Sequence, residues 1–299
     1  QGLRGEVKMP NPRLLQTAER WMNKEAPSDK GTQRPQVSGQ PVQNILYPDL
    51  PSDVFIFSYD GAHKEFTQEL IAKSNELFAG TRAEIPTGNS GEVKNMYIAK
   101  RMALVTAIAR RPSLRNYGLL PITPMQDECL LKEGRLQNPS KFWEDLGLIL
   151  YDTNGENQNE SKFLKESIKQ HKVELGLNND DLERRLIIVN PGAEVDKGMT
   201  YRIKPIVVPG ITQVYAHDIL NKTGENHIFE YGLDRGLPAI GEIGRGKRTL
   251  YMPSANQNIG LRVLYRGRVL NLDAGDRDLA GSDEAGRVNF APQGRASKK

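Results

Sequence analysis

The sequence predicts an α+β protein in which a helix-rich part precedes a β-rich part. Apolar residues recur at helical spacing in residues 62–78, 93–109 and 160–175. From residue 186 onward, short apolar runs such as Leu186–Val189 are separated by segments rich in glycine and proline. Because helices and strands occupy successive parts of the chain, we expect irregular antiparallel sheets with helices, and not repeated βαβ units.

The 299 residues divide into three parts. Residues 1–50 are rich in Pro, Gln, Gly and Ser, which predicts an N-terminal arm or linker. Residues 51–183 form the helix-rich part, which we interpret either as an accessory region or as an integral part of the domain that follows. Residues 184–299 predict a β-rich core.

Local signals place further elements within these parts. Thr123 and Gln126 have the form of a capping box, with Pro124 at the first helical position, so a helix is predicted to begin there. A short helix is also expected over residues 138–143. Strands are predicted at residues 53–59, 186–189, 203–209, 212–215, 249–252, 260–265, 269–272 and 287–290.

Composition excludes several classes of function. The net charge of +4 comes from 41 basic and 37 acidic residues, and the basic ones form no dense stripe, so we expect no nucleic-acid partner. No apolar run approaches the ~20 residues that span a bilayer, and no apolar signal segment is seen at the N-terminus. These features leave the cellular location open. Cys129 is the single cysteine, so no internal disulfide can form.

One set of residues has the residue types of a catalytic motif. Asp49, Glu92 and Lys94 have the residue types of a metal-dependent nuclease site, but the long gap after Asp49 is unusual. A turn aspartate and a glutamate near a helix N-terminus explain two of these residues equally well. The four histidines share no spacing typical of metal ligands.

A cluster of acidic residues near the C-terminus has the residue type of calcium ligands. Asp273, Asp276, Asp278 and Asp283 lie close together in the sequence. They lack the alternate acids, central glycine and closing glutamate of an EF-hand loop. A solvated acidic loop is the better interpretation, and we expect no metal and no other cofactor.

The C-terminal segment resembles a known family. The residues Asn-Ile-Gly-Leu-Arg-Val at 258–263 are similar to the conserved strand of C-type lectin folds in variable proteins of diversity-generating retroelements. Residues 264–288 resemble the variable repeat of archaeal members of that family. The specific likeness covers residues 249–290. It implies a C-type lectin-like fold with a helical N-terminal elaboration.

The resemblance implies which positions vary. In such systems a reverse transcriptase randomises adenines, mostly in Asn codons, so that Lys, Glu, Gln, Met and Trp cannot be reached. Within a variable region of about 264–289, the positions that fit this rule are Gly267, Val269, Asn271, Asp273, Gly275, Asp276, Arg277, Asp278, Gly281, Asp283 and Ala285. Glu284 and residues such as Leu270, Leu272 and Ala274 would be fixed.

The sequence pattern of this region predicts a surface on which residues can be substituted with little effect on stability. The odd-numbered positions from 267 to 275 alternate with Leu270, Leu272 and Ala274, which predicts one strand with a variable outer face and an apolar inner face. Substitutions on such an outer face change stability by only about 0.5 kcal/mol. Arg277 is the expected anchor for a ligand, because a guanidinium pairs bidentately with a carboxylate.

We therefore expect a monomeric, non-catalytic display protein that binds an unidentified protein or cell-surface ligand through residues 267–285. Formylglycine-generating-type enzymes share the lectin-like core, but their paired thiols cannot be supplied by Cys129 alone. Two alternatives stay open. One is a metal-dependent, nuclease-like enzyme that uses Asp49, Glu92 and Lys94, and the other is a plain structural or assembly protein.

Overall fold

The computed structural model describes residues 50–51, 53–155, 157–254, 260–276, 278–281 and 285–292. All of them belong to one compact unit, Tyr47–Lys299. The predicted N-terminal arm, residues 1–50, lies outside the described residues except for its last position.

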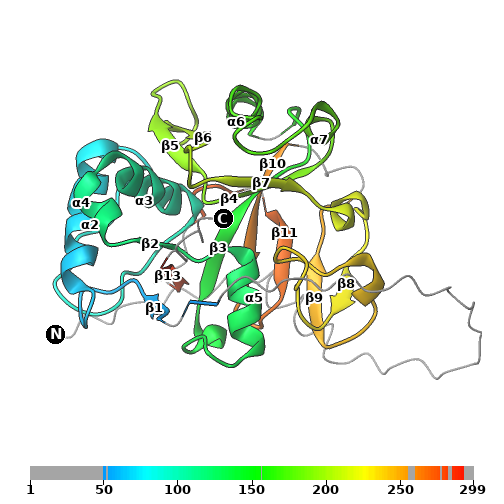
Figure 1. Ribbon diagram of the computed structural model, residues 1–299, viewed down its shortest axis with the longest axis horizontal. Coiled ribbons are helices and arrows are strands. Elements are labelled where there is room, and N and C mark those ends of the chain that lie inside the picture. Colours follow the sequence, from blue (N-terminus) through cyan, green and yellow to red (C-terminus); the bar gives the residue numbers. More distant parts are fainter. Residues whose placement is uncertain are drawn as a thin grey trace, which may run out of the picture. The chain divides into compact units, whose positions relative to one another are not determined.

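The described residues form helices and mainly antiparallel sheets, which confirms the predicted α+β class (Figure 1). The α-helices are α2 (Lys64–Phe78), α3 (Ile98–Arg110), α4 (Pro112–Asn116), α5 (Pro124–Lys132), α6 (Gln158–Gln170) and α7 (Asn179–Leu182). Short 3-10 helices are η1 (Pro139–Lys141), η2 (Asp218–Asn221) and η3 (Ile240–Glu242). The expected capping box is present, because Thr123 accepts a hydrogen bond from the backbone N–H of Gln126 and Gln126 reciprocates. No described helix has the length and apolarity needed to span a bilayer.

The largest sheet has the strand order β7-β4-β3-β10-β11-β9-β8, with β12 beside β3. Its strands are β3 (Trp143–Leu150), β4 (Leu186–Val189), β7 (Gln213–Ala216), β8 (His227–Phe229), β9 (Arg248–Tyr251), β10 (Leu261–Arg266), β11 (Leu272–Asp276) and β12 (Gly286–Arg287). Neighbours on this path are antiparallel except β11 and β9, which are parallel. Because β3 pairs with β4 and β10, the helix-rich and β-rich parts of the sequence share one sheet.

Two smaller sheets complete the unit. The strands β1 (Phe55–Ile56), β13 (Asn289–Pro292) and β2 (Leu119–Pro121) form a three-stranded antiparallel sheet in that order. The strands β5 (Gly192–Val195) and β6 (Ile203–Ile206) form a hairpin. Because β1 pairs with β13, strands from near the two ends of the described chain lie side by side (Figure 1).

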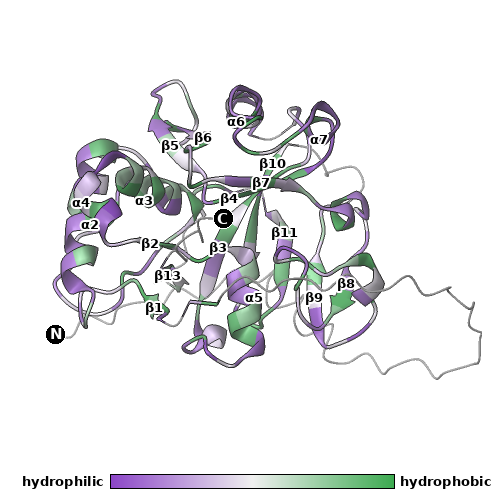
Figure 2. Ribbon diagram, viewed as in Figure 1, coloured by the Kyte–Doolittle hydropathy of each residue, from purple (hydrophilic) through white to green (hydrophobic). Residues whose placement is uncertain are grey.

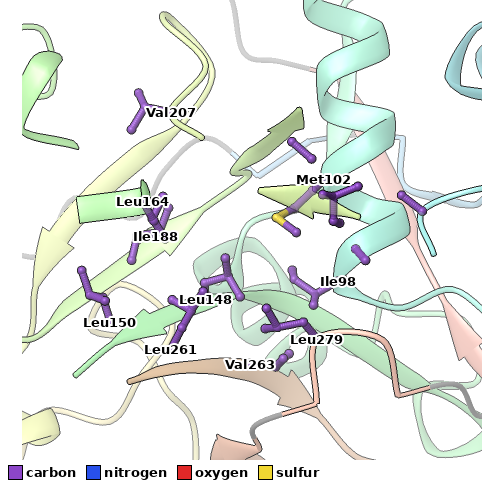
Figure 3. Packing of buried hydrophobic residues seen from close by; sticks show 14 of the residues in the cluster. Ile98, Met102, Leu148, Leu150, Leu164, Ile188, Val207, Leu261, Val263 and Leu279 are labelled. Carbon is purple, nitrogen blue, oxygen red and sulfur yellow. The ribbon is translucent and has the colours of Figure 1, made fainter. Parts of the chain in front are cut away.

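The central strands of the large sheet are buried on both faces. On one face, Ile98 and Met102 from α3 and Leu164 from α6 pack against apolar side chains of the sheet (Figure 3). On the other face, Leu146 and Leu264 belong to a second cluster built around β9 and β11. A strand that contacts protein on both sides is expected to be apolar along its whole length.

The strand β3 departs from the prediction for this segment. We predicted a short helix over residues 138–143, but the structure has only the 3-10 turn Pro139–Lys141, followed at Trp143 by the strand. The first residues of β3 are hydrophilic and the rest are hydrophobic, as Figure 2 shows. The sequence did not predict a strand here because Glu144 and Asp145 are acidic, and acidic residues are depleted in strands.

Glu144 is accommodated by a buried ionic network. Its carboxylate lies 3.3 Å from Nη2 of Arg266, and Nε of Arg266 lies 2.9 Å from Asp127 on α5. These three side chains are fully buried. Glu144 also accepts a hydrogen bond of 2.8 Å from the backbone N–H of Asn289, and Arg101 lies 3.8 Å away. Burial raises the pKa of Glu144, as does the neighbouring Asp127, while Arg266 and Arg101 act in the opposite direction.

This network predicts a large effect of one substitution. In Arg266→Met, the carboxylates of Asp127 and Glu144 would stay buried without their shared cation, so we expect the free energy of unfolding to fall by about 3–5 kcal/mol in urea denaturation. The matched control is Arg110→Met, which removes an exposed pair with Glu194 and should cost about 0–1 kcal/mol. Equal losses in the two variants would contradict this account.

Candidate ligand-binding surface

The first part of the segment with the predicted variable positions forms a hairpin inside the large sheet. The strand β10, which contains the second half of the family-like motif, lies between β3 and β11. Its residues Leu261, Val263 and Leu264 are almost completely buried. The hairpin is therefore anchored on one side by a strand that is itself part of the core.

The prediction of one continuous strand over residues 267–275 is wrong for its first half. Gly267 to Asn271 form a turn, in which the N–H of Gly267 donates to the carbonyl of Asn271 at 2.8 Å and the N–H of Leu270 donates to Gly267 at 2.9 Å. Leu270 has a left-handed backbone, with φ of 64°. The chain must reverse here because β10 and β11 are antiparallel neighbours. Positions 267, 269 and 271 therefore share no strand face.

The second half of the predicted strand does alternate as expected. Leu272 and Ala274 in β11 are fully buried in the core cluster that includes Phe229. Asp273 and Gly275 between and after them are partly exposed. The strand therefore separates an apolar inner face from an accessible outer face.

The remaining predicted positions differ in their exposure. Val269 at the tip of the turn is 75% exposed. Asp278 and Gly281 are exposed, and Asn271, Asp276 and Ala285 are partly exposed. Gly267 is buried, and a side chain there would meet the ring of Trp143 at 3.4 Å. The predicted positions Arg277 and Asp283, and with Arg277 the expected anchor, lie outside the described residues.

Several of these side chains also hold the local backbone. Asn271 Oδ1 accepts a hydrogen bond of 2.7 Å from the N–H of Thr249. Asp273 accepts one of 3.1 Å from the hydroxyl of Tyr265 and one of 2.7 Å from the N–H of Gly275. Asp278 accepts one of 2.9 Å from the N–H of Ala280. Asn and Asp are suited to such turns because their short side chains reach nearby backbone groups.

The pKa of Asp273 reflects its half-enclosed position. Burial raises this pKa, the backbone N–H of Gly275 lowers it, and the nearby carboxylate of Asp276 raises it further. The net direction is upward. The carboxylates of Asp273 and Asp276 therefore lie close enough to disfavour each other's ionisation.

A buried ion pair beneath the turn was missed by sequence analysis. Arg248 at the start of β9 donates from Nε to the carbonyl of Leu270 at 2.5 Å. Its two other nitrogens lie 2.5 and 2.6 Å from the carboxylate of Glu128 on α5, which also accepts from the N–H of Gly232 at 2.7 Å. Glu128 is fully buried. No local pattern marks this pair, because its members are 120 residues apart.

Sequence analysis also missed two aromatic residues beside the hairpin. Trp143 on β3 and Tyr265 on β10 have ring centroids 5.2 Å apart. Both are partly exposed. The available signal was that Tyr265 lies at the start of the predicted variable region, next to the family-like motif.

The residues of the nuclease-like alternative are not assembled into a described metal site. Glu92 pairs with Arg287 at 2.8 Å, and Lys94 is exposed. Asp49 lies outside the described residues. Within the part of the chain that the structure describes, no three His, Cys, Asp or Glu side chains are grouped to hold a metal ion, and this includes Asp273, Asp276 and Asp278.

Comparison with protein families, curated proteins and solved structures finds no match to this chain.

The geometry predicts that substitutions at different predicted variable positions will change the free energy of unfolding by different amounts. Val269→Asp should change the free energy of unfolding by no more than about 0.5 kcal/mol, because the side chain points into water. Asn271→Ala should cost about 1 kcal/mol, because the N–H of Thr249 loses its acceptor. Thermal or urea denaturation of the two variants measures both values. A larger loss for Val269→Asp than for Asn271→Ala would contradict this ranking.

Proposed function

We propose that this protein is a ligand-binding display protein of the diversity-generating retroelement type, with a C-type lectin-like fold and a variable recognition surface on the β10–β11 hairpin and the loop after it. One observation carries the proposal. Leu272 and Ala274 pack in the core while Asp273 and Gly275 face outward from the same short strand. The outer residues can then change without disturbing the inner ones.

The placement of the other positions supports the same function. Among the described residues, none of the predicted variable positions belongs to a hydrophobic core cluster. Arg248 and Glu128 fix the turn through its backbone, and this contact does not depend on which side chains the turn carries. A binding surface that is diversified by mutation needs both properties.

The charge of the surface favours a protein ligand over a nucleic acid. Asp273, Asp276 and Asp278 follow one another along β11 and the next loop. Nucleic-acid interfaces instead concentrate Lys and Arg, because they must neutralise phosphates. The role proposed for this surface is therefore recognition of a protein or cell-surface ligand, without catalysis.

Exchange of the surface residues tests the proposal. The variant replaces the predicted variable residues from Val269 to Ala285 together, using residue types that an Asn codon can reach, and keeps Asn271, whose amide oxygen accepts from the N–H of Thr249. We expect the melting temperature to change by no more than about 5 °C, because these side chains add little to the core. As the matched control, Leu272→Asp with Ala274→Asp should lower it by more than about 10 °C. A similar loss in both variants would overturn the proposal.

The neighbouring genes provide an independent test. We expect a reverse-transcriptase gene and an adenine-rich near-copy of the DNA that encodes residues 264–289. Sequencing of the flanking region decides this directly. If neither is present, the retroelement part of the proposal fails, whatever the stability of the exchanged variant.

A further inference from the structure

A row of alternating carboxylates and phenols crosses four strands of the large sheet. Asp145 on β3 lies opposite Tyr265 on β10, and Tyr265 lies opposite Asp273 on β11. Asp273 in turn lies opposite Tyr251 on β9. Directly opposed residues on neighbouring strands project to the same face of a sheet, so these four side chains form a continuous row.

The row is half-buried and opens to the surface at Tyr251. Tyr251 is 40% exposed, and the other three members are partly exposed. Trp143 precedes Asp145 by two positions on β3 and therefore projects to the same face. Its ring lies against that of Tyr265, so two aromatic rings border the carboxylates. Only Asp273 of this group is a predicted variable position, whereas the rest are contributed by strands outside the variable turn or at its edge.

One cation of the chain already uses this face. The guanidinium carbon of Arg268, an exposed residue of the turn, lies 5.9 Å from the ring centroid of Trp143. A guanidinium over an aromatic ring is a favourable cation–π arrangement. The ring face of Trp143 is thus compatible in shape and charge with an arginine side chain.

The phenol of Tyr265 lies among three carboxylates. Burial raises the pKa of this phenol, and the carboxylates of Asp273, Asp276 and Asp145 raise it further. Its hydroxyl donates a hydrogen bond to Asp273, which raises the pKa as well. An added positive charge would be attracted to all three carboxylates.

We propose that the Asp145–Tyr265–Asp273–Tyr251 row, with Trp143 beside it, recognises an arginine side chain of a protein partner. The partner's guanidinium would take the place of Arg268 over the ring of Trp143 and pair with Asp273 and Asp145, which combines the two interactions that arginine makes best. This inference rests on the proposed function, because it names the ligand chemistry of the same surface. It adds fixed residues on β3, β9 and β10 to the variable positions as determinants of binding.

A small-molecule probe tests the site without knowledge of the partner. The chain has two tryptophans, Trp21 and Trp143, so Trp21→Phe makes Trp143 the only indole reporter. Titration with N-acetyl-arginine amide should change its fluorescence saturably. The citrulline analogue has a similar shape but no charge, and it should produce no saturable change. Equal responses to the two probes would overturn the proposal.

Substitution of a residue in the row tests whether the arginine probe binds there. Asp273→Asn keeps an oxygen for the N–H of Gly275 and removes the charge. It should therefore lower the affinity for the arginine probe about three- to tenfold while preserving the fold. The matched control is Glu183→Gln at the exposed end of α7, which should leave the affinity unchanged. An unchanged affinity in Asp273→Asn, or an equal loss in both variants, would refute the site.

The affinity for the arginine probe should also depend on pH. Burial raises the pKa of Asp145 to about 7, with Asp276 and Glu144 adding to the shift and the N–H of Ile98 and the charge of Arg101 opposing it. Tyr265 and Asp273 complete the row beside Asp145. Only the ionised carboxylate attracts the guanidinium, so affinity should rise between about pH 6 and pH 8.

Asp145→Asn, which keeps an acceptor for the backbone N–H of Ile98, should reduce this rise. A rise of the same size in Asp145→Asn would exclude Asp145 from the site.

The two proposals fail in different ways. If exchange of the variable residues unfolds the protein but the arginine probe still binds as described, the display function is wrong and the cation site stands. If the exchange is tolerated and the probe does not discriminate arginine from citrulline, the display function stands and the inferred ligand chemistry is wrong. The stability and fluorescence measurements therefore report on separate claims.

Discussion

The arrangement of this protein depends on two consecutive acidic residues of α5 that are buried against arginines of the large sheet. Asp127 pairs with Arg266 on β10, and Glu128 pairs with Arg248 on β9. Arg266 also reaches Glu144 at the start of β3. A buried ion pair adds little net stability, but loss of one partner is costly because the other charge is left without compensation. The helix and three strands are therefore constrained to one mutual geometry.

This constraint is compatible with the proposed variable surface on the hairpin. Arg248 donates a hydrogen bond to the carbonyl of Leu270, so the backbone of the turn is fixed by a residue of β9. Leu272 and Ala274 are held by apolar packing. The outward side chains contribute local hydrogen bonds, such as that between Asn271 and Thr249, but the core does not depend on them. Rigid support with replaceable surface residues is the combination that a diversified binding protein requires.

The same sheet face changes character along its length. Near Leu148 and Val263 it is covered by α3 and α6 and is apolar (Figure 3). Toward Asp145 and Tyr265 it becomes polar and partly exposed, as the hydrophilic end of β3 in Figure 2 illustrates. A cationic side chain that binds at this end would be attracted by several carboxylates in a partly desolvated setting, where electrostatic interactions are stronger than in bulk water.

The sequence by itself determined the features that depend on near neighbours. The α+β class, the capping box at Thr123 and the inward Leu272 and Ala274 all follow from spacings of a few residues. The fully apolar strand Leu186–Val189 was likewise predicted with its observed bounds. Periodicity and capping are local properties, so a single sequence is enough to show them.

Only the tertiary structure decided that β3 is a central strand, that residues 267–271 turn, and that four strands align a row of carboxylates and phenols. Glu144 is tolerated in β3 because Arg266 is close in space, although 122 residues away in sequence. Likewise, Asp145 and Tyr251 come to lie in one row through strand pairing alone. The reason is physical: burial of charge and strand register depend on partners that no local pattern of residues specifies.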